Sequence, residues 1–91
     1  MTDTTTETIT ASVRYFAAAR AAAGRDSEEF TLPAGADLAA LITAVRAAHG
    51  PELSRVLDRC SYLVDEVAPR DHSVTLRHGA VVDVLPPFAG G

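Results

Sequence analysis

The chain has 91 residues, of which 47% are hydrophobic, and a formal net charge of −4 at neutral pH. A chain of this length forms one domain with a modest core, so we expect residues 1–91 to fold as a single domain. All basic residues are arginines, and they are scattered along the chain, which speaks against nucleic acid or an anionic membrane surface as a partner. The single cysteine, Cys60, excludes an internal disulfide, and the longest apolar runs are too short to span a bilayer. We therefore predict a cytoplasmic protein.

The N-terminal part of the chain predicts a strand. Residues 1–8 are rich in threonine and without pattern, and they are expected to fray or to form the edge of this strand. From residue 9 onward the residues alternate, which is typical of a strand with one buried face. The inward face is predicted to carry Ile9, Ala11, Val13 and Tyr15, and the outward face Thr10, Ser12, Arg14 and Phe16.

A short helix and a second strand are expected next. Residues 17–23 are rich in alanine and precede Gly24, which favours a helix with a glycine cap. Residues 25–33 then form a strand that points Phe30 and Leu32 inward and ends at Pro33. The acidic segment within it, residues 26–29, is interpreted as a solvated turn rather than a docking site for a basic partner.

The strongest helix signal follows Asp37, which occupies the position of an N-cap. Leu38, Leu41, Ile42 and Val45 form one apolar stripe at helical spacing. The helix is expected to end near His49, before Gly50-Pro51. A weaker stripe predicts a second helix over residues 52–59.

The C-terminal third is predicted to contain three strands, over residues 61–69, 72–77 and 81–85, with a turn at His78-Gly79. One sheet crossed by one long helix is the simplest packing for this order of elements. The sequence therefore predicts an α+β protein of the β-grasp, or ubiquitin-like, architecture.

The chain ends in the letters LPPFAGG, directly after an apolar strand pattern. Two prolines restrict the backbone before the tail, Phe88 is an apolar residue without a core to join, and Gly90 and Gly91 carry no Cβ. A tail with this pattern can enter a narrow pocket on another protein. We predict that residues 86–91 form an exposed, flexible tail.

A β-grasp pattern that ends in Gly-Gly resembles the prokaryotic sulfur-carrier family. Within that family, the segments VRYFAAARAAAG, DLAALITAVRAAHG and DHSVTLRHGAVVDVLPPFAGG are most similar to the small subunit of molybdopterin synthase. Three positions depart from the pattern of that subunit. Ala80 and Val81 stand where an acidic pair is usual, and Asp83 stands where a small apolar residue is usual.

The resemblance implies a function for the terminal carboxylate. A ubiquitin-activating-like adenylyltransferase would use ATP to adenylate Gly91, and a sulfur donor would convert it to a thiocarboxylate. The large subunit of molybdopterin synthase would then accept that sulfur for dithiolene formation in molybdopterin. The carrier itself would bind no cofactor or metal and would hold no catalytic constellation. Partner contacts are expected from Pro86, Pro87, Phe88, Ala89 and Gly90, and from Arg14 and Phe16 on the outward sheet face.

Three alternatives stay open at this point. The chain could carry sulfur for protein-bound cysteine or thiamine synthesis, it could be a ubiquitin-like modifier of other proteins, or it could be a non-catalytic interaction module. Cys60 is interpreted as a half-buried core residue rather than a reactive thiol. The three histidines, His49, His72 and His78, show no metal-ligand spacing.

Overall fold

The computed structural model describes residues 7–87; residues 1–6 and 88–91 lie outside the described part of the chain. The predictions for Phe88, Ala89, Gly90 and Gly91 therefore fall outside the described residues. Of the N-terminal segment predicted to fray, residues 7 and 8 are described, and Thr8 begins the first strand.

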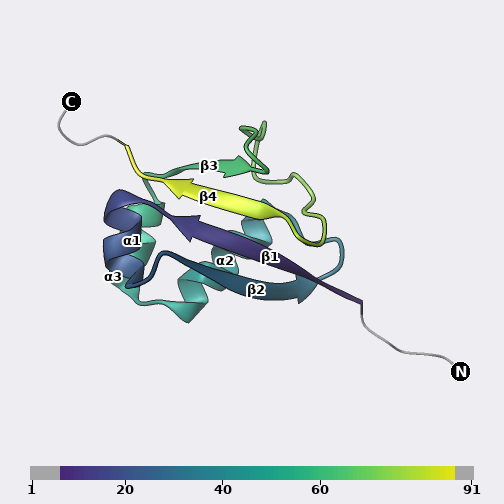
Figure 1. Ribbon diagram of the computed structural model, residues 1–91, viewed down its shortest axis with the longest axis horizontal. Coiled ribbons are helices and arrows are strands. Elements are labelled where there is room, and N and C mark those ends of the chain that lie inside the picture. Colours follow the sequence, from purple (N-terminus) through teal and green to yellow (C-terminus); the bar gives the residue numbers. More distant parts are fainter. Residues whose placement is uncertain (1–6, 88–91) are drawn as a thin grey trace, which may run out of the picture.

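The described residues form one mixed sheet with helices on one face (Figure 1). The strands are β1 (Thr8–Tyr15), β2 (Ser27–Pro33), β3 (Ser61–Val64) and β4 (Val81–Leu85), in the order β2-β1-β4-β3. β1 pairs antiparallel with β2 and parallel with β4, and β3 pairs antiparallel with β4. The two central strands therefore come from opposite ends of the chain and run in the same direction.

The core lies between the sheet and the helices, as the alternating pattern of β1 predicts. The inward residues of β1 are all buried, whereas Arg14 on the other face is exposed. Inward residues of β4 and the apolar stripe of the long helix complete this layer. The largest fully buried side chains are Leu38, Leu41, Leu53, Val13, Val82 and Val84.

The helices begin and end where their capping residues predict. α1 (Ala17–Ala23) ends at Gly24, whose φ of 77° is the left-handed conformation that glycine adopts readily. α2 (Leu38–Ala48) begins at Asp37, whose side chain accepts a hydrogen bond from the Ala40 N–H at 2.9 Å. α3 (Pro51–Leu57) has proline in its first turn, where a missing N–H costs nothing.

Two strand predictions in the C-terminal third were wrong. The strand expected over residues 61–69 stops at Val64, because Asp65 and Glu66, with φ of 50° and 70°, make a tight turn back to Val67. Residues 72–77 form no strand of the sheet. Leu76 is buried as the alternation predicts, but the segment pairs with the loop before α2 through a single bridge from Thr75 to Asp37.

The carboxyl end of β4 lies at the end of the sheet where α1 and α3 gather (Figure 1). The segment after β4, which leads to the predicted functional tail, therefore starts beside these two helices. Among residues 7–87, no helix combines the length and the apolar composition needed to cross a bilayer.

Candidate functional site

The base of the tail is formed by Pro86 and Pro87, directly after the last residue of β4. Pro86 is half-buried and Pro87 is exposed. Their rings restrict the backbone at the point where the chain leaves the sheet. The described part of the tail is therefore anchored to the body at Pro86 and turned outward at Pro87.

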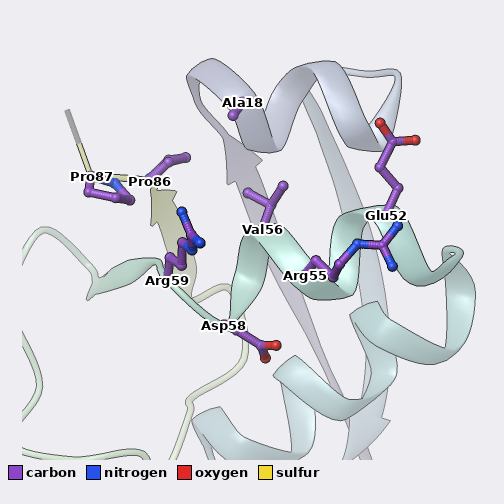
Figure 2. Close-up of a pocket in the computed structure, with 8 residues that line it drawn as sticks. All are labelled: Ala18, Glu52, Arg55, Val56, Asp58, Arg59, Pro86 and Pro87. Carbon is purple, nitrogen blue, oxygen red and sulfur yellow. The ribbon is translucent and has the colours of Figure 1, made fainter. Parts of the chain in front are cut away.

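A groove of about 830 Å³ opens beside this base. We call it the α1–α3 groove; it is lined by Ala18, Glu52, Arg55, Val56, Asp58, Arg59, Pro86 and Pro87. Figure 2 shows Val56 and Ala18 in its middle, with the Arg59 side chain directed toward the two prolines. The groove thus combines an apolar floor with cationic side chains at the root of the tail.

The charged side chains of this groove differ in whether they are already paired and in where they point. The Asp58 carboxylate pairs with Arg46 of α2 at 2.7 Å, and in Figure 2 it points away from the prolines. The Arg55 side chain extends toward Glu52, at the far end of the groove (Figure 2). Arg59 makes no ion pair with any residue in the range 7–87. Arg59 is therefore the cation available nearest to the base of the tail.

The sheet face opposite the helices carries a second group of predicted site residues. The Arg14 guanidinium donates from Nε to one oxygen of Asp83 at 2.6 Å and from an Nη atom to the other at 3.1 Å. It also lies 5.6 Å from the centre of the Phe16 ring, within cation–π range. The structure therefore brings Arg14 and Phe16 together, as the shared outward face predicted.

Asp83 was not predicted as a member of this group. It is 6% exposed, and the strand register places it between Arg14 of β1 and Leu63 of β3. Burying a carboxylate destabilises the fold unless the carboxylate has an ion-pair partner and hydrogen bonds. The bidentate contact with Arg14 gives Asp83 both the opposite charge and the hydrogen bonds. The same hydrogen bonds raise the pKa of the Arg14 guanidinium above its ordinary value. The signal in the sequence was the unusual aspartate in an apolar strand, but its partner could be found only by assuming the parallel β1–β4 register.

A cluster of polar side chains under the helices was also missed. The Tyr15 hydroxyl donates to Oε2 of Glu28 at 2.5 Å, and Nε2 of His49 lies 2.5 Å from the same oxygen. Burial alone would raise the pKa of the Glu28 carboxyl, but the hydrogen bonds from Tyr15 and His49, together with nearby positive charge including the Arg25 guanidinium, hold the pKa below its ordinary value. The interpretation of residues 26–29 as a solvated turn was wrong for Glu28, which lies in β2 and ties that strand to the end of α2.

Cys60 is half-buried, as predicted. Its thiol donates to the Val56 carbonyl at 3.2 Å, and burial raises its pKa to about 11. A thiol in this environment is mostly protonated and unreactive near neutral pH. Within the described range, no group of three or more histidine, cysteine or carboxylate side chains is placed to hold a metal ion.

The sequence profile of the ThiS family matches residues 13–91. The chain belongs to the ThiS family. This match covers both candidate surfaces and the Gly-Gly end, and it confirms the resemblance to the sulfur-carrier family and the β-grasp fold.

Individual relatives agree with the family match. A protein of Chlamydomonas reinhardtii described as a molybdopterin synthase sulfur carrier subunit is 36% identical over 81 residues, which cover 87% of this chain and 95% of that protein. A Pyrococcus furiosus structure described as molybdopterin converting factor subunit 1 is 30% identical, with a TM-score of 0.79, over 88% of this chain and 99% of that one. A Helicobacter pylori structure described as a complex of subunits 1 and 2 of molybdopterin-converting factor is 25% identical, with a TM-score of 0.63, over 91% and 100% of the two chains.

Proposed function

We propose that the chain is a sulfur carrier and the small subunit of a molybdopterin synthase. Its Gly91 carboxylate is adenylated and then converted to a thiocarboxylate, which donates sulfur for dithiolene formation in molybdopterin. The observation that carries this proposal is the family match through residue 91, joined to relatives that are themselves described as molybdopterin synthase or converting-factor subunits.

The chemistry explains why the tail has this composition. A carboxylate is a poor electrophile because a nucleophile must add charge to an anion. An adenylyltransferase removes this obstacle by joining the carboxylate to the α-phosphate of ATP with release of pyrophosphate. A sulfur nucleophile then attacks the acyl carbon and expels AMP, so that one oxygen of the carboxylate is replaced by sulfur. The catalytic groups and ATP belong to the activating enzyme, and this chain supplies the carbon that reacts.

The body supplies positioning. From Pro86 an extended tail of six residues reaches roughly 20 Å, and Gly90 and Gly91 allow its tip to enter a narrow active site. Pro86 and Pro87 reduce the entropy that the tail loses on binding. The folded part of the chain must supply the rest of the affinity for the partner. Its uncovered sheet face carries Phe16 next to the Arg14 guanidinium, which Asp83 holds in place. We propose that the large subunit docks on this face while the tail enters its active site.

Intact-mass measurement tests the proposed chemistry. The chain is co-expressed with an adenylyltransferase of the ubiquitin-activating type and a cysteine-derived sulfur source, and then weighed by mass spectrometry. We expect a species in which one oxygen of Gly91 is replaced by sulfur. The matched control carries one alanine appended after Gly91 and is expected to fold normally and to remain unmodified. An unchanged mass of the native chain would reject the carrier function.

A second measurement separates the alternatives. Addition of the large subunit and the pterin precursor to the sulfur-loaded chain should yield molybdopterin. Sulfur loading without molybdopterin formation would indicate a carrier for another pathway, such as protein-bound cysteine or thiamine synthesis. Recovery of the chain covalently attached to lysines of other proteins would indicate a modifier, and neither loading nor attachment would indicate an interaction module.

A further inference from the structure

The proposed function assigns the uncovered sheet face to the large subunit, but it gives no role to the buried carboxylate of Asp83 in the middle of that face. Side chains of a strand alternate between its two faces, so Val81 and Leu85 share the outward face of β4 with Asp83. The strand register places Leu63 of β3 beside it. All three neighbours are half-buried apolar residues. The ion pair of Asp83 with Arg14 therefore lies in otherwise apolar surroundings.

The stability of the fold gives no reason for this ion pair. Apolar residues of similar size that replace a buried ion pair often leave stability unchanged or increase it. Valine is also favoured in strands, and Val82 and Val84 already occupy the positions on either side of Asp83. An aspartate that is 6% exposed in the middle of such a strand therefore points to a role in recognition.

We propose that Asp83 is a positioning residue for docking of the large subunit: it holds the Arg14 guanidinium so that the remaining N–H groups of Arg14 donate to an uncharged acceptor, a main-chain carbonyl oxygen of that partner. The inference rests on the proposed function, because it deepens the docking on the sheet face proposed there. Asp83 is buried, so it acts through Arg14 and does not itself recognise the partner.

The geometry of Arg14 leaves it able to bind a second group. Asp83 accepts from Nε at 2.6 Å and from one Nη atom at 3.1 Å, and a guanidinium carries further N–H groups beyond these. The Arg14 side chain is 50% exposed, and its guanidinium also lies 5.6 Å from the centre of the Phe16 ring. An arginine that is already ordered in the free protein loses little side-chain entropy when a partner binds it.

The surroundings of the guanidinium favour a neutral acceptor over a carboxylate. A hollow of about 320 Å³ opens beside it, lined by Arg14, Asp65, Glu66 and Val81. Asp83 compensates the charge of Arg14, and Arg77 pairs with Asp65 at 3.3 Å. Within residues 7–87 the charge of Glu66 has no ion-pair partner, so a partner carboxylate in this hollow would meet net negative charge. A carbonyl oxygen accepts the same hydrogen bonds without this repulsion.

The test compares four full-length proteins by isothermal titration calorimetry with the large subunit of molybdopterin synthase from the same organism. They are the native chain, Asp83→Val, Asp83→Val combined with Arg14→Met, and the control Glu52→Gln, which also removes one negative charge but at an exposed position of α3. We expect Asp83→Val to weaken the complex about fivefold, because the partner must then order a free arginine. Adding Arg14→Met should weaken it by at most about twofold more, and the control should bind like the native chain.

Unfolding in urea separates positioning from a purely structural role. The double variant leaves no unpaired charge in the sheet, so it should be at least as stable as the native chain although it binds more weakly. If affinity fell only in variants that had also lost stability, Asp83 would have a structural role and the inference would be wrong.

Three further outcomes decide the remaining points. An unchanged dissociation constant for Asp83→Val would overturn the inference, and so would a much larger loss in the double variant, because Arg14 would then bind without being held. The ratio of the dissociation constants of the double variant and the native chain should stay within about twofold between about 0.05 and 0.5 M salt; a ratio that approaches one at high salt would reject the neutral acceptor. Failure of the native chain to bind the large subunit would reject the proposed function as well, whereas native binding with unaffected variants removes only the positioning role.

Discussion

The uncovered sheet face makes a quantitative prediction for Phe16→Ala. Phe16 is 37% exposed, and a fully exposed phenylalanine presents roughly 200 Å², so about 75 Å² remains available for a partner to cover. At about 25 cal/mol per Å² this area contributes about 1.9 kcal/mol to binding. If the large subunit covers the ring, the substitution should weaken the complex by up to roughly 20-fold.

Isothermal titration calorimetry with the large subunit of molybdopterin synthase from the same organism measures this change. The control is Thr43→Ala, because Thr43 is an exposed residue of α2 and so lies on the helical side, opposite the uncovered sheet face. The control should bind like the native chain. An unchanged dissociation constant for Phe16→Ala, with the circular dichroism spectrum retained, would show that the large subunit does not dock on this face.

Three further predictions concern the fold itself. Glu66→Gly should raise the free energy of unfolding in urea by roughly 0.5–1 kcal/mol, because Glu66 has a φ of 70° that glycine adopts without strain. Glu28→Gln should lower the free energy of unfolding by about 1–2 kcal/mol at pH 7. The pKa of the Glu28 carboxyl is lower in the folded protein than its ordinary value of about 4.5. The difference in unfolding free energy between the native chain and Glu28→Gln should therefore persist at pH values above 4.5, and it should vanish as the pH falls through the pKa of the folded protein. Cys60 should react with iodoacetamide at pH 8 at least about tenfold more slowly in the native chain than in urea, since burial raises its pKa to about 11.

Each of the three predictions on the fold has a control variant or an outcome that would contradict it. Glu29 is an exposed strand residue next to Glu28, so Glu29→Gly should destabilise the fold and Glu29→Gln should leave it unchanged. If Glu66→Gly lowered the free energy of unfolding, the contacts of the Glu66 side chain would stabilise the fold by more than its positive φ destabilises it. If the difference in unfolding free energy between the native chain and Glu28→Gln grew below about pH 4, the pKa of Glu28 could not be lowered in the fold. Native Cys60 that reacts as fast as the unfolded thiol would show that the residue is not shielded.

Local signals explain what the sequence predicted correctly. β1 follows strict alternation, α2 combines an N-cap aspartate with an apolar stripe, and α1 ends at a glycine with positive φ. All of these depend on residues a few positions apart. Alternation also identified the face that carries Arg14 and Phe16.

The errors have two causes: a partner that lies far away in the sequence, and a turn that lacks the usual turn residues. Leu76 sits in an extended, alternating segment, but its N–H donates to the Ala36 carbonyl before α2 rather than to a strand. The turn at Asp65 and Glu66 contains none of the glycine or asparagine that usually accompanies two consecutive positive φ angles. The Arg14–Asp83 pair joins positions 69 apart in the chain. Periodicity within a segment carries no information about the distant partners of Leu76 and Arg14, nor about a turn made by residues that rarely adopt positive φ.

The position of β4 has a consequence for how the protein is made. β4 lies inside the sheet, between β1 and β3, so the centre of the sheet cannot assemble until residues 81–85 have left the ribosome. Pairing across nearly the full length of the chain slows folding relative to local contacts. An incomplete nascent chain therefore cannot present the folded sheet face, and a partner that docks on this face, as proposed, could bind only after the end of the sheet has been synthesised.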